Sequence, residues 1–142
     1  ARPTIMPVKA SALWISSGFG WRKNPFTGLK QFHEGLDISG NRGTPIIVTS
    51  FGKIKKVGYN RFLGNYVEVI HDERFSTRYG HLLKAAVKKS EQVKRGQVIG
   101  YMGTSGMSTG YHLHYEVVDN EKKVNPYYFI LNRKDLSFTA SK

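Results

Sequence analysis

The sequence predicts a mainly β fold in which antiparallel β-sheets form a groove flanked by long loops. From Thr44 onward, short runs of β-branched and aromatic residues alternate with turn-forming residues, which is typical of a β domain. In residues 65–71, polar and apolar side chains nearly alternate, as they do in a strand with one buried face. The chain has 142 residues, enough for one domain with its own hydrophobic core.

The expected elements follow in chain order. Residues 1–15 are predicted to form an extended N-terminal segment, because Pro3 and Pro7 disfavour a helix. Residues 16–43 are rich in glycine, asparagine, proline and serine, which is typical of loops. Strands are predicted over Ile46–Ser50, Lys53–Gly58, Tyr66–His71, Ser76–His81, Val98–Met102 and His112–Val118.

One or two short helices complete the predicted fold. Leu83–Lys88 has apolar residues at helical spacing, and Pro126–Leu131 begins with a proline, which is favoured in a first helical turn. The polar residues 133–142 are expected to form a strand end or a frayed tail. Because no repeat or linker divides the chain, we expect one domain over residues 16–132 between the segment 1–15 and this tail.

The composition limits the partners that the protein can have. Lys and Arg total 22 against 10 Asp and Glu, a formal charge of +12, which attracts polyanions such as nucleic acids, anionic membranes or anionic wall polymers. The basic residues are spread along the chain without a nucleic-acid-binding motif, so we predict a generally basic surface and no nucleic-acid partner. No apolar run reaches the roughly 18 residues of a membrane span. The absence of cysteine excludes disulfides and thiolate ligands and is compatible with an oxidising compartment.

Four of the five histidines lie in three short segments that suggest a metal site. His33 precedes Asp37 by four residues, His81 follows a glycine, and His112 and His114 are two residues apart. Two imidazoles and one carboxylate, with a coordination position left for water, make a catalytic zinc centre. The residue types alone do not say which of the five would bind the metal.

The His112–Val118 strand places several polar side chains on one face. Residues at i and i+2 of a strand share a face, so His112, His114 and Glu116 point to one side, while Leu113 and Tyr115 point to the core. Two histidines on a polar face favour metal binding or catalysis. Glu116 has two open interpretations: it orients a histidine from behind, or it pairs with a lysine on a neighbouring strand.

His33 and Asp37 can share one ion only if the backbone bends between them. A helix would bring them together and make Glu34 a general base, but Gly35 in its middle would cost about 1 kcal/mol. On a straight strand the two residues would be roughly 13 Å apart. We therefore expect a bend, which Gly35 permits.

Two further features of the sequence are a glycine-rich segment and the remaining histidine. The segment Gly103–Gly110 is a flexible turn or a groove wall, and it matches neither a phosphate-binding loop nor a dinucleotide fingerprint. His71 lies at the end of a predicted strand and is interpreted as a surface or capping residue without a catalytic role.

A family resemblance now emerges from several motifs together. The segments concerned are Ser16–Gly20, His33-x-Gly35-x-Asp37, Gly43–Pro45, Gly64–Tyr66, Tyr79–Leu82, Val93–Gln97 and Ser108–Glu116. Through these segments the sequence resembles, from about Ser16 to Pro126, the M23 metallopeptidases, the lysostaphin- and LytM-type zinc endopeptidases of bacterial cell walls. One departure is Tyr111, where the family commonly has proline before the His-x-His pair. This departure removes no ligand.

The resemblance implies a role for each of the five residues His33, Asp37, His81, His112 and His114. It implies one Zn²⁺ per chain, bound by His33, Asp37 and His114. It also implies that His81 and His112 are the catalytic histidines that do not bind zinc. They would take the proton of the attacking water, stabilise the developing oxyanion and protonate the leaving amine.

The resemblance further implies a substrate and a cellular location. We expect hydrolysis of the peptide cross-links of bacterial peptidoglycan, at the D-Ala–diaminopimelate bond, because the chain has no recognisable wall-binding module of a secreted bacteriolysin. The alternatives are a glycyl-glycine endopeptidase of the same family and a non-catalytic LytM-like activator of wall hydrolases. The expected partners are peptidoglycan peptide stems. The expected state is a monomeric catalytic domain of a longer protein in the periplasm or cell envelope, or secreted.

Overall fold

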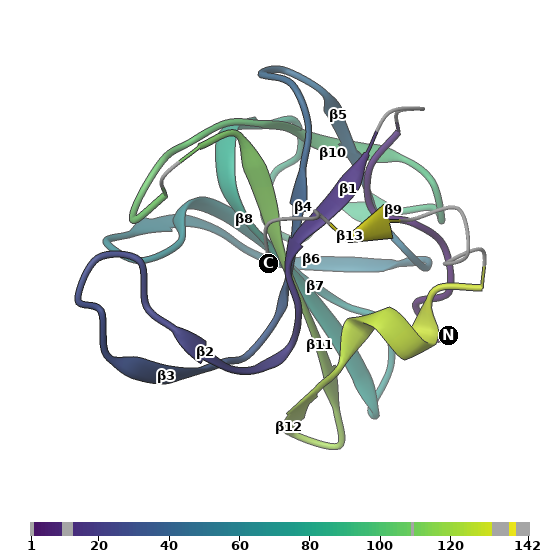
Figure 1. Cartoon of the computed structure of the whole chain (residues 1–142). Coiled ribbons are helices and arrows are strands. Elements are labelled where there is room, and N and C mark those ends of the chain that lie inside the picture. The colour runs from purple at the N-terminus through teal and green to yellow at the C-terminus, as the bar shows by residue number, and fades with distance from the viewer. Residues whose placement is uncertain (1, 10–12, 109, 132–136, 139–142) are drawn as a thin grey trace.

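The fold was analysed in a computed structural model that describes residues 2–9, 13–108, 110–131 and 137–138 (Figure 1). The elements are β1 (Trp14–Ser17), β2 (Gly20–Lys23), β3 (Lys30–His33), β4 (Leu36–Ser39), β5 (Pro45–Ile47), β6 (Gly52–Asn60), β7 (Gly64–Ile70), β8 (Phe75–Ala85), β9 (Gln92–Val93), β10 (Val98–Met102), β11 (His112–Asp119), β12 (Lys122–Val124), the 3₁₀ helix η1 (Pro126–Phe129) and β13 (Ser137–Phe138). The prediction of a mainly antiparallel β protein is confirmed.

One eleven-stranded sheet forms the body of the molecule. Its main path runs β13-β1-β4-β11-β8-β7-β6-β9, with β10 joining β8 to β5 and β12 extending β11. Every pair in it is antiparallel except β1 with β13. β2 and β3 form a separate two-stranded hairpin that stands outside the large sheet (Figure 1).

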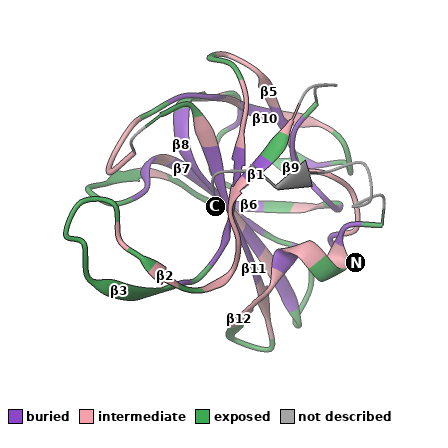
Figure 2. Ribbon diagram, viewed as in Figure 1, coloured by how far each residue is buried: buried purple, intermediate pink, exposed green. Residues whose placement is uncertain are grey.

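The hydrophobic core lies on the central strands of the large sheet. Figure 2 shows buried positions concentrated on β7, β8 and β11, whereas much of the β2–β3 hairpin is exposed. The largest fully buried side chains include Tyr79, Tyr115, Ile38, Leu82, Ile99 and Leu113. Burying a side chain of this size stabilises the fold by about 1.5–3 kcal/mol. The rigid centre of the sheet therefore carries β4, β8 and β11, from which the candidate site is built.

All six predicted strands exist. β10 has the predicted bounds Val98–Met102, and the other five strands have shifted ends. Two other expectations are wrong. Residues 16–43 contain parts of four strands, because β1 and β4 are held by pairing with distant segments although their local composition is that of loops. The helix expected over Leu83–Lys88 is the end of β8, where Lys84 pairs with Tyr101 and buried Leu82 with Met102.

The C-terminal part contains the one helical turn of the described residues. Pro126–Phe129 is a 3₁₀ helix, and the side chain of Asn125 accepts the backbone N–H of Tyr127 at its start. Of the predicted tail 133–142, only Ser137–Phe138 is described, and it pairs in parallel with β1. The remainder of this tail lies outside the described residues. Across the described residues, the chain contains no helix long and apolar enough to span a membrane.

His71 is buried, so its interpretation as a surface residue is wrong. Its Nδ1–H donates to the carbonyl oxygen of Phe51 at 2.8 Å, and its Nε2 lies 2.8 Å from the hydroxyl of Thr77. The Thr77 hydroxyl continues this buried network to the hydroxyl of Tyr79. Burial lowers the pKa of His71 below its usual value of 6.5, against smaller opposing effects from Phe51 and Asp72.

The buried His71 predicts an acid-sensitive contribution to stability. Below pH 6.5 the His71 ring binds a proton more readily in the unfolded chain than in the folded protein. The stabilising contribution of His71 to the folded state is therefore fully present above pH 6.5 and decreases as the pH falls below that value. In thermal melts between pH 8 and pH 5, His71→Gln should be less stable than the parent at pH 8, and the difference should narrow at pH 5. A difference in melting temperature that stays constant over this range would contradict the prediction.

Candidate metal centre

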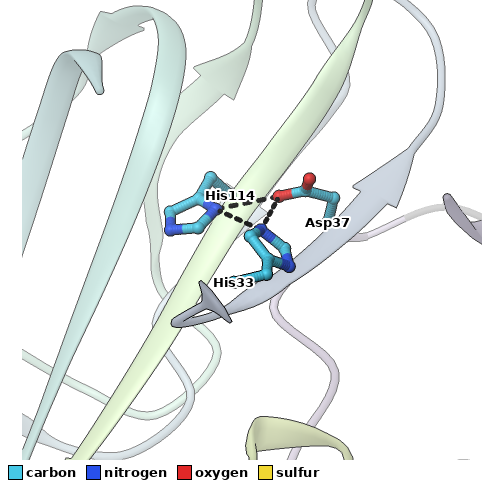
Figure 3. A group of neighbouring side chains, drawn as sticks. All are labelled: His33, Asp37 and His114. Carbon is cyan, nitrogen blue, oxygen red and sulfur yellow. Dashed lines mark hydrogen bonds and ion pairs between the residues drawn. The ribbon is translucent and has the colours of Figure 1, made fainter. Parts of the chain in front are cut away.

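Strand pairing brings Asp37 and His114 together across the sheet. β4 and β11 are antiparallel neighbours in which Asp37 lies directly opposite His114, and β8 places Gly80 on the other side of His114. His33 ends β3, and the chain turns between it and β4. The three side chains point toward one another from these elements (Figure 3). The expected bend between His33 and Asp37 is confirmed.

The polar atoms of the three side chains have the spacing that a metal ion requires. Asp37 Oδ1 lies 2.8 Å from His114 Nδ1 and 3.3 Å from His33 Nε2. His33 Nε2 and His114 Nδ1 are 3.3 Å apart. A tetrahedral zinc ion with bonds of about 2.0–2.1 Å separates its ligand atoms by about 3.3 Å. The donor set therefore fits one small divalent cation.

Hydrogen bonds from the opposite ring nitrogens orient both histidines of the cluster. His33 Nδ1–H donates to the carbonyl oxygen of Gly18 at 2.8 Å. His114 Nε2–H donates to Glu116 Oε2 at 2.9 Å. Each bond directs the remaining ring nitrogen, Nε2 of His33 and Nδ1 of His114, toward Asp37. Metal-binding histidines are commonly held in this way by an oxygen acceptor behind the ring.

The electrostatics of the cluster favour a positive charge at its centre. Burial opposes ionisation of Asp37, but hydrogen bonds from His114 and His33 hold the pKa of this carboxyl well below its usual range. Burial likewise lowers the pKa of His114, but its hydrogen bonds to Asp37 and Glu116 outweigh burial and raise the pKa to about 9. The two buried carboxylates, Asp37 and Glu116, thus stabilise a positive charge on the His114 ring that lies between them. A divalent metal ion at His114 Nδ1 would take the place of the proton on that nitrogen.

His81 and His112 lie next to the three-residue cluster. Their ring centroids are 4.7 Å apart, and the rings of His81 and His114 are separated by 6.0 Å. His112 Nε2 is 3.9 Å from Asp37 Oδ1. Burial and the nearby His112 lower the pKa of His81 to about 4, and burial also lowers the pKa of His112. Both rings are therefore neutral near pH 7, so each has one ring nitrogen without a proton.

The ring of His81 is held in place by a strained backbone and a neighbouring loop. His81 adopts a φ of +60°, which is unfavourable for a residue with a side chain. Its backbone N–H donates to the carbonyl oxygen of Leu63 at 2.6 Å, and its Nδ1–H donates to that of Ser105 at 2.7 Å. This arrangement leaves Nε2 of His81 as its available proton acceptor.

The sequence model described as peptidase family M23 matches residues 31–126, more than half of the chain. The chain belongs to peptidase family M23.

Relatives of this M23 chain include two proteins of Vibrio cholerae. The peptidoglycan DD-endopeptidase ShyC is 43% identical over 113 residues, which make up 79% of this chain and 26% of ShyC. The peptidoglycan DD-endopeptidase ShyB is 41% identical over 120 residues, or 84% of this chain and 28% of ShyB. A crystal structure described as a zinc containing peptidase from Vibrio cholerae superposes with a TM-score of 0.80 at 40% identity, covering 86% of this chain and 38% of that one. The chain thus spans only a minor part of the length of these relatives.

Gly35 is needed in this M23 site for space rather than for backbone freedom. It is absent from the described glycines with positive φ, so its backbone conformation is open to other residues. A Cβ built on it would lie 2.7 Å from the carbonyl oxygen of Tyr115 and 2.8 Å from Cε1 of His114. The turn between His33 and Asp37 therefore passes directly against the His114 ring, a contact that the sequence interpretation did not anticipate.

Glu116 fulfils both interpretations that the sequence left open. It accepts the hydrogen bond of His114, and its Oε1 lies 3.4 Å from Arg78 Nη1 and 3.5 Å from Lys123 Nζ. Burial raises the pKa of Glu116, but His114, Lys123 and Arg78 together lower it below the usual value. The sequence did not predict that Arg78 and Lys123 contact Glu116. The strand register that places Arg78 opposite Glu116 is not visible in either segment alone.

The five residues lie in an open groove of about 1290 Å³. The β2–β3 hairpin forms one wall, and parts of the segments 60–63 and 107–112 also line the groove. The prediction that part of Gly103–Gly110 contributes a groove wall is confirmed for Met107 and Gly110. The cluster can therefore be reached from solvent through the groove.

Gly64→Ala should disturb His81 without touching a candidate metal ligand. Gly64 has a φ of +63°, and an added Cβ would lie 2.3 Å from the backbone of Ser105, the residue that holds the His81 ring. We expect a loss of about 2–4 kcal/mol in folding stability, combining left-handed strain with a backbone clash. Hydrolytic activity should fall while the metal content of the folded protein stays constant.

The matched control for this variant is Gly96→Ala. Gly96 has a φ of +86°, but an added Cβ would meet nothing within 4 Å, so only the backbone strain of about 1–2 kcal/mol is incurred. Chemical denaturation and metal analysis of both variants would separate the two contributions. Equal stability and equal activity in the two variants would contradict the proposed support of His81 by the Ser105 loop.

Proposed function

We propose that the chain is a zinc-dependent endopeptidase that hydrolyses the peptide cross-links of peptidoglycan, with one zinc ion held by His33, Asp37 and His114. The observation that carries this proposal is the convergence of these three donors beside the neutral pair His81 and His112. The similarity to the peptidoglycan DD-endopeptidases ShyC and ShyB and to the zinc containing peptidase of Vibrio cholerae supports the same function.

The residues beside the cluster supply the proton transfers of the proposed reaction. A zinc ion, when bound, provides a Lewis acid for the scissile carbonyl and a water of lowered pKa. Nε2 of His81 can accept the proton of that water, because Nδ1 of the same ring is occupied by the Ser105 carbonyl. The Nδ1–H of His112 donates to the carbonyl oxygen of Gly110 at 3.1 Å, which leaves Nε2 of His112 without a proton. Once Nε2 has accepted a proton released in the attack, His112 can stabilise the oxyanion and pass that proton to the leaving amine.

We propose the D-Ala–diaminopimelate cross-link as the bond that is cut, since relatives above 40% identity are described as DD-endopeptidases. The glycyl-glycine bond is the alternative within the family. A non-catalytic activator role is disfavoured, because all five residues are present and gathered in one groove. The proposed setting is the periplasm or cell envelope, with residues 16–132 acting as a monomeric catalytic domain.

Digestion of purified cell walls tests the proposed function. Walls cross-linked through diaminopimelate and walls cross-linked through pentaglycine are incubated separately with the protein, and the fragments are analysed by mass spectrometry. We expect cross-linked dimers from the first wall to become monomers, with loss of activity on chelation and recovery on addition of zinc. Cleavage of the pentaglycine wall alone would establish the alternative bond, and no cleavage of either wall by zinc-loaded protein would overturn the proposed function.

A further inference from the structure

The β2–β3 hairpin carries an exposed aromatic face beside the candidate active site. Trp21 and Phe32 are directly opposite each other in the hairpin, and 68% of Trp21 and 40% of Phe32 are exposed. Both side chains line the groove together with His33, which directly follows Phe32. Exposed apolar patches of this kind on a soluble domain commonly mark binding surfaces.

The aromatic rings are arranged to support one another. The Phe32 ring packs at near right angles against Phe19, with centroids 5.1 Å apart, and against Trp21, with centroids 5.4 Å apart. These edge-to-face contacts restrain the rings while most of Trp21 stays accessible to solvent. A ring held in one orientation loses little conformational entropy when a ligand packs on it.

The turn of the hairpin is rigid as well. The Asn24 side chain accepts the backbone N–H groups of Phe26 and Thr27, and the Asn24 N–H donates to the carbonyl oxygen of Leu29. The N–H of Gly28 donates to the carbonyl oxygen of Asn24. Because this turn is closed by its own hydrogen bonds, the hairpin holds its aromatic side chains in place along the groove before any ligand binds.

We infer that the Trp21–Phe32 face binds the sugar rings of the peptidoglycan glycan strand while the peptide stem occupies the groove. This inference rests on the proposed function. A pyranose ring has an apolar C–H face that packs on an aromatic ring and a rim of polar groups that accept hydrogen bonds. In the wall polymer each peptide stem is attached to a glycan strand, so sugars lie next to any stem bound near His33. Lys30, on the same hairpin face as Phe32 and with its Nζ 5.9 Å from the centroid of the Trp21 ring, supplies a donor for the polar rim.

A sugar polymer explains the placement of the aromatic face better than a lipid bilayer does. The turn of the hairpin also exposes two apolar side chains, Phe26 and Leu29, as a bilayer-binding loop would. Phe19, Trp21 and Phe32, however, lie at the other end of the hairpin, beside His33, where they line the groove. A polymer that packs along these rings therefore also lies in the groove. Binding to anionic vesicles is nevertheless a measurable outcome, and it is included in the test.

The first test measures binding without catalysis. Metal-free protein is mixed with wall glycan strands from which the peptides have been removed, and binding is followed by co-sedimentation. Trp21→Ala should bind these strands about tenfold more weakly than the parent, while Phe51→Ala, which removes an aromatic ring that is 59% exposed outside the groove, should bind them equally well. Equal binding by the parent and Trp21→Ala, or binding of the parent to phosphatidylglycerol vesicles but not to glycan, would overturn the inference.

The second test separates the inference from the proposed function. On intact cross-linked wall, Trp21→Ala should raise KM about tenfold with little change in kcat, and on a sugar-free cross-linked peptide it should match the parent. An equal rise in KM on both substrates would overturn the inference by assigning the hairpin to the peptide. If the parent cleaves neither substrate, the proposed function fails, and the co-sedimentation result still decides whether the hairpin binds glycan.

Discussion

Replacing His114 with alanine is expected to remove zinc and hydrolytic activity together. His114 Nδ1 lies 2.8 Å from Asp37 Oδ1 and 3.3 Å from His33 Nε2, so its loss leaves two of the three candidate ligands. His33→Ala and Asp37→Ala should have the same effect. Zinc content measured on the purified proteins should fall from one ion per chain to a small fraction of that, and activity should become undetectable.

The matched comparison is with His81→Ala and His112→Ala. These side chains lie in the same groove but are proposed to transfer protons, so zinc should remain at one ion per chain while the rate falls by roughly 10²–10⁴-fold. Metal analysis and wall digestion on the same preparations separate the two groups. A His114→Ala protein that retains full zinc, or a His81→Ala protein that retains full activity, would refute the division of the five residues into ligands and proton-transfer groups.

Local patterns sufficed to predict several parts of this site. The spacing of His112 and His114 placed both on one strand face, and the bend between His33 and Asp37 followed from excluding a helix and a straight strand. Sequence alone could not predict that Asp37 lies opposite His114, since this pairing joins residues 77 positions apart. The division into ligands and catalytic histidines came from the family resemblance and not from the residues themselves.

The wrong predictions share a physical cause. Helical spacing in Leu83–Lys88 was overridden because β10 extends the pairing of β8 as far as Ala85. The loop-like composition of residues 16–43 did not prevent strands, because β1 and β4 complete the large sheet beside β11. His71 looked exposed at a strand end, but the Phe51 carbonyl and the Thr77 hydroxyl give its ring buried partners. A contact with a segment outside the local window contributed to each case: β10 for Leu83–Lys88, β11 for residues 16–43, and Phe51 for His71.

Glu116 is the residue whose substitution should weaken zinc binding without removing a ligand. It is 4% exposed and accepts Nε2–H of His114, the nitrogen opposite the one that faces Asp37. Its negative charge orients the ring and makes Nδ1 a stronger donor to a metal. Arg78 and Lys123, 3.4 Å and 3.5 Å away, stabilise that buried charge.

Glu116→Gln keeps the shape of the side chain and an oxygen acceptor for His114 but removes the charge. We expect its zinc affinity, measured by competition with a chromogenic chelator, to fall about tenfold, and that of Glu116→Ala to fall about 100-fold. Glu68→Gln is the control, because Glu68 also lies beside Arg78, at 3.6 Å, and does not contact His114. If Glu116 only stabilises the sheet, both glutamine variants will lower the melting temperature and leave zinc affinity unchanged. If it positions the metal ligand, only the substitution at Glu116 will weaken zinc binding.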